Sequence, residues 1–581
     1  MKSLSLRTVG AACALAALLA VGGCRHRKST SAENTAQYAE NMKPLVAAKK
    51  LPFLRWPNFS DYAPAVATFY DDRNYEVAWT RDGKPTATAL AFIDQFDDAA
   101  AKGLNPEDYD ASRWPGRVEK LAGRSAEMIA QFDVAMTVDV MRYISDLRIG
   151  RVNPSHFNFD IDVKSKRYDL AEFVSDNVVD AKDVPKLMEG VEPNSEEYRR
   201  TEIALGHYLA LAKQQQKLAA PPLPTMKKAL TVGEHYPATR ALLKRLQLEG
   251  DAPANEAIRG DSHVYTAALS DAVKHYQQRH GLEENGKLGP QTIGAMNVPL
   301  TQRVVQLQDA LERWRWLPDK YLNAPLIVNL PEFVLRGYRP DHQLDFKMKV
   351  VVGKVMGEHQ TPVFAHMMRY LVFRPYWNVP VDIAKKELVP HMERDPGYLE
   401  SHNFEVTNSK HKVLTDYTVK QVARGNVLVR EKPGPKNSLG LIKFMFPNQY
   451  DIYLHSTPVP SLFNRSRRDF SHGCIRVQKP EELAVWVLNG QLDKDKQPWD
   501  LEKVQQAMSD DGQDNRIVVL KTPIPIVIFY VTAEVEDDGE IHFFDDIYGY
   551  DADLQKALSK GPPYPVKPEP VTGNSKPGDT V

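Results

Sequence analysis

A proline-rich segment, Pro221-Pro222-Leu223-Pro224, divides this 581-residue chain into two parts that carry different sequence patterns. The part before it, up to about Lys217, is mainly helical, with apolar residues at three- and four-residue spacing that predict one buried face. The clearest face consists of Phe132, Met136, Val140, Ile144 and Leu147. A chain of this length is too long for a single core, so we expect about three domains.

The part after Pro318 is rich in β-branched and aromatic runs bounded by Pro, Gly, Asn and Asp, which predict a mostly antiparallel β domain. The expected strands are Leu326–Leu330, Phe346–Val352, Met368–Phe373, Val427–Arg430, Tyr450–Leu454, Ile517–Leu520 and Ile526–Ala533. Residues 383–426 interrupt the strands with helical and polar segments, and an insertion of this size is a candidate lid. A late helix is expected at Val504–Met508.

The N-terminus carries the pattern of a secretory signal. Lys2 and Arg7 precede an apolar run that ends at Val21. At roughly 13 residues the run is too short to span a bilayer. The sequence Val21-Gly22-Gly23-Cys24 then resembles the bacterial lipobox, in which the cysteine becomes the lipidated first residue of the mature protein. The alternative is an ordinary signal peptide whose Cys24 is accidental.

The cysteine count leaves one thiol for the mature chain. Cys13 lies inside the signal and Cys24 would be acylated, so of the three cysteines only Cys474 remains. Thiols normally pair in secreted compartments, and an unpaired one is either an inert buried residue or a nucleophile. The neighbours favour a nucleophile, because fifteen residues separate His455 from Ser471-His472-Gly473-Cys474.

Cys474 and His455 are the essential pair of a cysteine acyl-transfer site. Attack on an acyl carbon requires the thiolate, and an imidazole can take the thiol proton and return it to a leaving amine. The carbonyl or hydroxyl of Ser456 is the candidate that fixes the imidazole tautomer. His472 is the alternative base, but its place at the turn favours an orienting role. Because Gly473 has no Cβ, the amides of His472, Gly473 and Cys474 are oxyanion-hole candidates.

A second pattern lies between the proline-rich segment and Pro318. Ala272–Leu282 predicts a helix that ends at a glycine, and Gly286, Gly289 and Thr292 predict a second turn and a new helix capped near Thr292. This order of an aromatic-Gln pair, Gly-Leu, two glycines and a threonine resembles the small three-helix peptidoglycan-binding module. The alternative is a helical hairpin that binds nothing.

The spacing between His455 and Ser471-His472-Gly473-Cys474 resembles the catalytic domain of the YkuD-type L,D-transpeptidases. Arg476 stands where many members have Asn, and in this it resembles the large, multi-domain YcbB type. Three further segments resemble that type, namely Arg374–Pro380, Pro433–Asn437 and Lys443–Asn448. The resemblance covers residues 50 to 530 approximately.

The resemblance implies a reaction and a set of site residues. Family members attack the bond before the terminal D-Ala of a peptidoglycan tetrapeptide stem, form a cysteine thioester and pass the acyl group to an amine of a second stem, which gives a 3→3 cross-link. Cys474 would be the nucleophile and His455 the base and acid. The residues expected to line the substrate site are Tyr376, Trp377, Asn378, Tyr453 and Arg476. Carbapenem-type inhibitors are expected to acylate Cys474.

The expected fold class is therefore multi-domain α+β: a helical N-terminal scaffold, a small three-helix peptidoglycan-binding module, and a mostly antiparallel β catalytic domain with an inserted lid. The expected boundaries are a signal peptide at 1–23, a tether at 24–50, the scaffold at 51–217, the module at 225–300, the catalytic domain at 324–525 with its lid at 383–426, an extension at 526–560 and a disordered tail at 561–581.

Composition and the scatter of histidines exclude several functions. The net charge is −1, from 74 basic and 75 acidic residues, and gives no reason to expect nucleic-acid binding. The histidines lack ligand spacing and no glycine-rich phosphate loop is present, so no metal or cofactor is expected. We expect a periplasmic lipoprotein held by its lipid anchor, at the outer membrane more than the inner because Arg25, not Asp, follows the cysteine.

Two other functions remain open from the sequence. Water could replace the acceptor amine, which would make the protein an L,D-carboxypeptidase or endopeptidase. A non-catalytic lipoprotein that binds the wall would leave Cys474 chemically silent.

Overall fold

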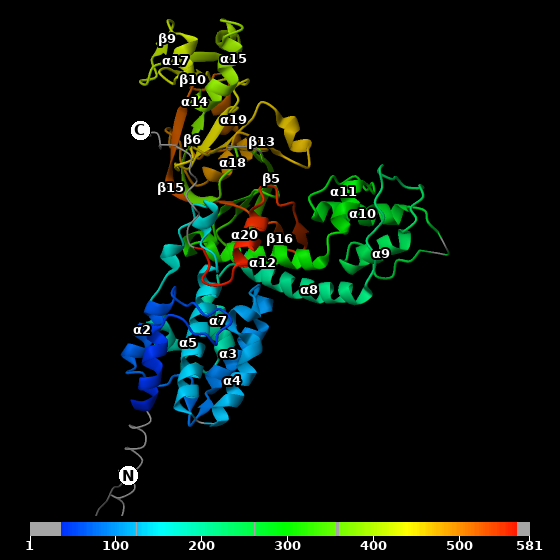
Figure 1. Ribbon diagram of the computed structural model, residues 1–581. Coiled ribbons are helices and arrows are strands. Elements are labelled where there is room, and N and C mark those ends of the chain that lie inside the picture. Colours follow the sequence, from blue (N-terminus) through cyan, green and yellow to red (C-terminus); the bar gives the residue numbers. More distant parts are fainter. Residues whose placement is uncertain are drawn as a thin grey trace, which may run out of the picture.

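The computed structural model describes residues 36–123, 125–258, 260, 262–355, 359–509 and 511–565. The chain is a multi-domain α+β protein, as expected from the sequence: an N-terminal helical domain, a three-helix module to one side and a β domain at the opposite end (Figure 1). The expected signal peptide and Cys24 lie outside the described residues. None of the described helices is long and apolar enough to cross a membrane.

The N-terminal helical domain is built around α5 (Ala126–Ile149), which is buried on almost every side. The other helices of this part are α2 (Ala63–Asp72), α3 (Ala87–Asp97), α4 (Trp114–Lys120), α6 (Leu170–Phe173), α7 (Val184–Val191) and α8 (Glu196–Leu218), and β1 (Thr80–Arg81) pairs with β2 (Lys84–Pro85). Asp133 on α5 accepts hydrogen bonds from the amides of Ala78 at 3.0 Å and Trp79 at 2.8 Å. This buried carboxylate fixes the segment before β1 to the central helix.

Both ends of the described chain pack onto this domain, which corrects two expectations. Residues 36–47, expected in the tether, are helical, and Met42 and Val46 are buried because their four-residue spacing places them on one helix face. Residues 561–565 were expected in the disordered tail, but the Tyr564 hydroxyl donates to Asp108 at 2.5 Å. The remaining tail residues, 566–581, lie outside the described part.

The three-helix module consists of α9 (Thr239–Leu248), α10 (Ala267–Arg279) and α11 (Pro290–Met296). Buried Gln277 organises its turn: Oε1 accepts from the amides of Asn285 at 3.1 Å and Gly286 at 2.8 Å, and Nε2 donates to Thr292 Oγ1 at 3.1 Å. Gly286 has φ +64°, and a Cβ there would lie 2.6 Å from Ser270 Oγ. Thr292 therefore lies inside α11 as a buried partner of Gln277, not at the start of the helix as expected.

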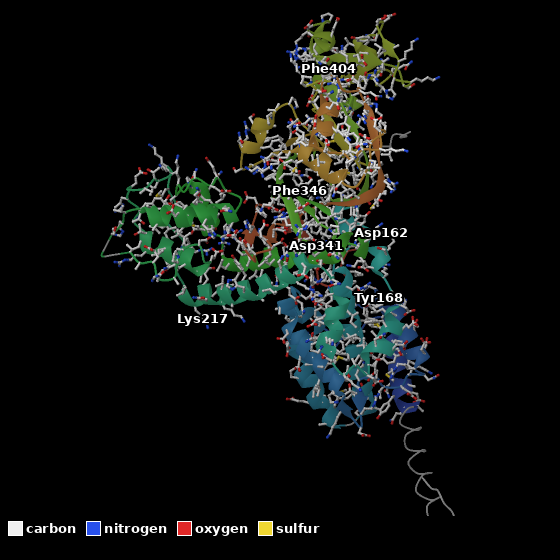
Figure 2. The ribbon with its side chains drawn as sticks, turned by 180° about the vertical axis from the view of Figure 1, so that it is seen from behind. Asp162, Tyr168, Lys217, Asp341, Phe346 and Phe404 are labelled. Atoms are coloured by element: carbon white, nitrogen blue, oxygen red, sulfur yellow. The ribbon has the colours of Figure 1, made fainter. Side chains whose placement is uncertain are left out.

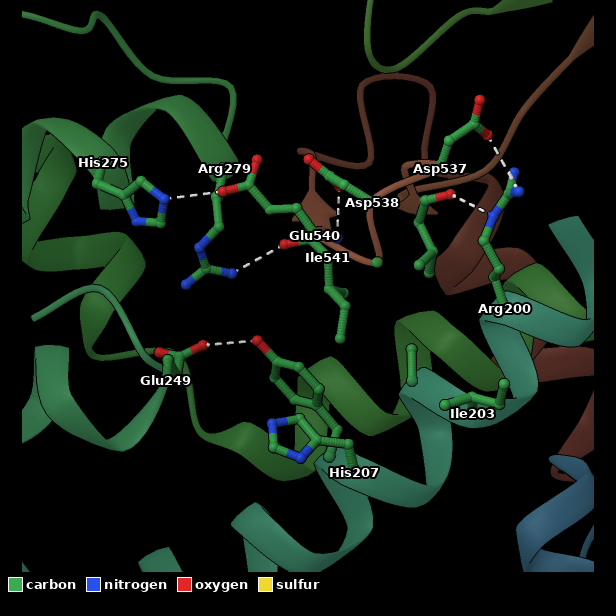
Figure 3. Close-up of a pocket in the computed structure, with 14 residues that line it drawn as sticks. Arg200, Ile203, His207, Glu249, His275, Arg279, Asp537, Asp538, Glu540 and Ile541 are labelled. Carbon is green, nitrogen blue, oxygen red and sulfur yellow. Dashed lines mark hydrogen bonds and ion pairs between the residues drawn. The ribbon is translucent and has the colours of Figure 1, made fainter. Parts of the chain in front are cut away.

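The module is held on the β domain by charged contacts with a hairpin of β16 (Ala533–Val535) and β17 (Ile541–Phe543) (Figure 3). Arg279 donates to the Ile541 carbonyl at 2.8 Å, and His275 Nε2 lies 2.8 Å from Glu540 Oε1. A cavity of about 610 Å³ lies between α8, α10 and the hairpin. Lys217, at the end of α8, lies under the module (Figure 2).

The β domain is a nine-stranded sheet in the order β13-β5-β14-β12-β11-β6-β15-β3-β4. The strands are β3 (Leu326–Asn329), β4 (Val334–Tyr338), β5 (Leu344–Gly353), β6 (Phe364–Phe373), β11 (Ile442–Met445), β12 (Leu454–His455), β13 (Asp469–Ser471), β14 (Ile475–Val477) and β15 (Arg516–Phe529). Because β4 also pairs with β5, the sheet closes on itself. The adjacent helices are α12 (Leu300–Trp316), α13 (Asp319–Leu322), α18 (Pro480–Val487), α19 (Leu501–Met508) and α20 (Tyr550–Leu558).

Two expected strand assignments change. The two last expected strands are parts of one long strand, β15, which has an irregularity between Val519 and Ile524. The segment expected as strand Tyr450–Leu454 is mostly irregular, since Asp451 has φ +52° and only Leu454–His455 pair as β12. The irregular loop that leads into β12 therefore lies directly beside Cys474, the candidate nucleophile.

The insertion is larger than expected and has its own sheet and core. Its elements are β7 (Trp377–Asn378), α14 (Val381–Ile383), a π-helical turn (Ala384–Leu388), α15 (Val389–Met392), α16 (Tyr398–Ser401), β8 (Phe404–Thr407), β9 (Val413–Leu414), α17 (Val419–Ala423) and β10 (Leu428–Glu431). The four strands pair in the order β7-β10-β8-β9 around a separate apolar cluster. We call residues 377–431 the insert, and Phe404 marks it at the far end of the β domain (Figure 2).

Candidate active site

Strand register places three basic side chains in one row on the β domain. His455 on β12 pairs with Lys443 on β11 and with Arg476 on β14. Residues paired across adjacent strands point to the same face. The neighbours Phe444, Leu454 and Ile475 point to the other face, where they are fully buried in the core. The row therefore lies on the face away from this core.

Cys474 immediately precedes β14 and lies on the same face as Arg476, two residues further on. The Ile475 amide donates to the Tyr453 carbonyl at 3.1 Å, so the cysteine is fixed beside the loop that leads into β12. The thiol donates to the Asp451 carbonyl at 3.6 Å and is hydrogen-bonded by Tyr453. Burial raises the pKa of the Cys474 thiol to about 11, although Tyr453 and the Lys443 charge act in the opposite direction.

His455 is held by the carbonyl proposed from the sequence. Its Nδ1 lies 2.6 Å from the Ser456 carbonyl, an acceptor, so Nδ1 carries the proton and Nε2 carries the free electron pair of the neutral ring. The residue is 4% exposed. Burial, followed by the Arg476 charge, lowers the pKa of His455 to about 3. The resting pair is therefore a neutral thiol and a neutral imidazole, and the thiol hydrogen bond goes to Asp451 rather than to His455.

The turn before the thiol uses one of the three amides expected in the oxyanion hole. The Gly473 amide donates to Ser471 Oγ at 3.1 Å, which leaves the amides of His472 and Cys474 as the candidates. The Gly473 carbonyl accepts from Thr361 Oγ1 at 2.6 Å. Gly473 has φ +118°, and a Cβ there would lie 3.1 Å from Ile452 Cδ1, so both the backbone and the space favour glycine.

His472 faces the insert. Its Nε2 lies 2.7 Å from Glu387 Oε1, and its ring contacts His359 edge to face with the ring centroids 4.9 Å apart. This contact links the turn before Cys474 to the π-helical turn of the insert, and the orienting role of His472 stays a prediction.

The remaining predicted substrate residues divide between two places. Tyr453 and Arg476 lie beside Cys474, whereas Tyr376, Trp377 and Asn378 lie at the base of the insert. The Arg430 guanidinium stacks 4.0 Å from the centre of the Tyr376 ring, and Asn378 is exposed and pairs with Arg430 across the small sheet. Trp377 and Asn378 therefore belong to the small sheet of the insert and Tyr376 directly precedes it, whereas Cys474 directly precedes a strand of the nine-stranded sheet.

The sequence analysis missed four residues that the structure brings to this site: Lys443, Asp451, Glu387 and Thr361. Only Lys443 had a usable signal, because it alternates with buried Ile442 and Phe444 within a segment already singled out by resemblance. Among the residues that the structure describes, no group of three or more His, Cys, Asp and Glu residues could hold a metal ion.

The Cys474 thiol, the buried His455 imidazole with its fixed tautomer and the turn at Gly473 together form a candidate site for nucleophilic acyl transfer by cysteine. Comparison with known proteins specifies the class further. Residues 324–519 match the model described as "L,D-transpeptidase catalytic domain", residues 237–296 match "Putative peptidoglycan binding domain", and residues 64–205 match "Scaffold domain". The three matches together confirm the resemblance to multi-domain L,D-transpeptidases that was expected from the sequence.

Two individual proteins are similar to the chain. A "Putative L,D-transpeptidase" of Haemophilus influenzae is 31% identical over 329 residues, which cover 55% of this chain and 63% of that protein, less than two thirds of its length. The crystal structure of an L,D-transpeptidase from Xylanimonas cellulosilytica matches with 14% identity over 53% of this chain and 100% of that one, and the TM-score of 0.15 supports no inference.

Proposed function

We propose that this chain is a peptidoglycan L,D-transpeptidase that forms 3→3 cross-links through a thioester on Cys474. The observation that carries the proposal is that Cys474 directly precedes β14, whose parallel partner β12 carries His455 on the same face, with His455 Nδ1 donating to the Ser456 carbonyl. This arrangement leaves Nε2 available to accept a proton on the face that carries the thiol.

The acylation step requires one proton transfer in each direction. The Cys474 thiol proton moves to His455 Nε2 while sulfur attacks the carbonyl carbon that precedes the terminal D-Ala of a tetrapeptide stem. The amides of His472 and Cys474 stabilise the oxyanion of the tetrahedral intermediate. The C–N bond then breaks, D-Ala leaves as a neutral amine with the proton from His455, and a thioester remains.

In the second half of the reaction, the transfer of the acyl group to the acceptor, the same bonds change in the opposite order. An amine of a second stem attacks the thioester, its proton moves to His455, and the C–S bond breaks. The proton returns to sulfur, so the thiol is regenerated and an amide joins the two stems. The Cys474 thiol and the His455 imidazole are both neutral at rest, so their own charges form only when the thiol proton is transferred.

The insert would favour transfer over hydrolysis by covering the bound donor stem and excluding water. The contact between His472 and Glu387 supports this role, since it joins the insert to a residue whose amide is an oxyanion-hole candidate. The peptidoglycan-binding domain, held on the β domain by Arg279, would keep the enzyme on its polymer.

The decisive experiment is incubation of the purified protein with disaccharide-tetrapeptides, followed by mass spectrometry of the muropeptides. We expect cross-linked dimers that have lost one D-Ala, and no product from Cys474→Ala. Tripeptides without dimers would instead indicate an L,D-carboxypeptidase. Equal product from Cys474→Ala would reject the cysteine mechanism, and a carbapenem adduct on Cys474 in the intact mass would exclude a non-catalytic wall-binding protein.

We also propose that the protein works in the periplasm, anchored by a lipid on Cys24. The lipobox-like sequence supports this proposal, as do the matched peptidoglycan-related domains. Labelling of cells with a palmitate analogue tests it: the label is expected on the wild-type protein and absent from Cys24→Ala. Equal labelling of both proteins would reject the anchor.

A further inference from the structure

Lys443 lies at the nucleophile without a carboxylate of its own. The residue is half-buried on β11, directly opposite His455, and its ammonium lies 5.3 Å from the centre of the Tyr453 ring. Tyr453 in turn hydrogen-bonds the thiol of Cys474. In the part of the chain that the structure describes, no ion pair within 4.0 Å is found for Lys443. Burial lowers the pKa of Lys443, and the charge of a Cys474 thiolate opposes that shift.

Two other buried or half-buried lysines, Lys102 and Lys166, have conventional structural partners. Lys102 forms ion pairs with Glu192 and Glu202, and Lys166 donates to the Arg315 carbonyl at 2.7 Å. A cation placed near an aromatic ring and a thiol, with no carboxylate, is costly unless an anion forms beside it. The anion that this site can form is the thiolate.

The imidazole cannot supply the permanent counter-charge. Cysteine sites that hold a resting thiolate usually stabilise it with an imidazolium or another nearby cation. Here burial and the Arg476 charge keep His455 neutral. The charged and titratable groups that face the sulfur are Lys443, Tyr453 and Asp451, with Arg476 two residues along the same strand. Of these, Asp451 disfavours the thiolate, whereas Lys443 and Tyr453 favour it.

We propose that Lys443 is a positioning residue for the reaction: its ammonium is the counter-charge of the Cys474 thiolate and sets how readily the nucleophile ionises. The proposal rests on the proposed function only in taking Cys474 as the nucleophile. When His455 removes the thiol proton, the negative charge on sulfur forms beside Lys443. Sulfur carries no negative charge in the thioester. Lys443 therefore stabilises the free thiolate of Cys474 but not the acylated enzyme.

The test is the rate at which iodoacetamide alkylates Cys474, measured from pH 6 to 10 by mass spectrometry of the Cys474 peptide in the full chain. For Lys443→Met we expect about tenfold slower alkylation at pH 7, equivalent to one pKa unit, and a profile displaced to higher pH. Lys443→Arg keeps the charge and should stay within about threefold of wild type. The matched control is Lys349→Met, an exposed strand lysine on β5, which should leave the profile unchanged.

An unchanged profile in folded Lys443→Met would overturn the proposal. If that variant does not fold, the reciprocal measurement in Cys474→Ala decides. At pH 11.5, where most of the wild-type Cys474 is thiolate, Lys443 should lose its proton more easily in Cys474→Ala and be acetylated faster, because the interaction acts equally on both groups. Equal acetylation in wild type and Cys474→Ala would then reject the pairing. Alkylation does not depend on cross-linking, so failure of the proposed function and failure of this inference are distinguishable.

Discussion

His472 Nε2 lies 2.7 Å from Glu387 Oε1, and this contact connects the turn that carries Cys474 to the insert. The two side chains come from segments 85 residues apart in sequence. Both are partly exposed, at 26% and 50% of the side chain, so the pair contributes little to overall stability. Its position next to Gly473 makes it important for the geometry of the site instead.

Glu387→Gln tests that connection. Removing the carboxylate charge should weaken the hold of the insert on the turn before Cys474, admit water and lower the ratio of cross-linked dimer to hydrolysed tripeptide by about twofold, in line with ~0.5 kcal/mol for an exposed contact. Muropeptide mass spectrometry gives the ratio directly. Glu393→Gln, an exposed position that follows α15 in the same insert, is the control. The same ratio in all three proteins would show that the contact does not govern water access.

The pH dependence of the thiol follows from its burial. Because burial raises the pKa of Cys474 to about 11, the thiolate fraction at pH 7 is small and should rise about tenfold for each pH unit up to pH 10. The alkylation rate of the free protein should therefore keep increasing through pH 9. A plateau between pH 8 and 9 would mean that the thiol ionises like an exposed cysteine.

His455 links stability to pH in the acidic range. Burial lowers the pKa of His455 to about 3 in the folded protein, below its ordinary value of 6.5, so the unfolded chain binds the extra proton between these values. The free energy of unfolding should fall as the pH drops from 6.5 towards 3. His455→Gln should reduce this dependence and abolish acylation. Urea titrations of both proteins at pH 7, 5 and 4 measure the difference, and identical slopes would contradict it.

Gly473→Ala combines positive φ with a close contact to Ile452 Cδ1. We expect a loss of stability of about 1–3 kcal/mol from backbone strain and a slower acylation by carbapenem, because the adjacent amides lose their alignment. Gly294→Ala on α11 is the matched control, since a Cβ there meets no atom within 4 Å and alanine favours a helix. Urea unfolding and intact-mass kinetics provide the two readouts.

Gln277→Ala should loosen the three-helix module and leave the thiol unaffected. The substitution removes the acceptor for the amides of Asn285 and Gly286 and leaves the buried Gly286 amide unsatisfied, at a cost of about 1–3 kcal/mol. Hydrogen exchange should accelerate in residues 285–292, while alkylation of Cys474 stays as in wild type. Unchanged exchange at those amides would mean that the glutamine does not organise the turn.

The sequence predicted those features that depend only on residues close together in the chain. The thiol, His455 and the glycine turn were found from one stretch of sequence, and the helix face on α5 from its periodicity; the catalytic roles stay predictions. The row of Lys443, His455 and Arg476 was not found, because it depends on register among three strands distant in sequence. Likewise, the amide of Gly473 was expected to be free, and only the fold brings it to Ser471 Oγ.

The insert was expected at residues 383–426 but spans 377–431, because strand pairing, like the register above, is not visible in the sequence. Val427–Arg430 was correctly expected as a strand but assigned to the main sheet, since a strand pattern does not reveal its partner. The structure pairs β10 with β7 and β8 instead. The helix at 36–47 was read as tether because its buried face consists of two separated apolar residues, and burial there depends on the domain that receives them.

The bond from Tyr564 to Asp108 adds a contact between the N-terminal helical domain and the part of the molecule that carries Cys474. The two parts are also joined by α8, and Glu312 on α12 accepts from the amides of Arg151 and Val152. Contacts at separate places resist rotation of one part against the other. If the N-terminal side is tethered as proposed, this construction would limit how far Cys474 can move relative to the membrane, and cleavage after α20 would remove one of those contacts without touching Cys474 or His455.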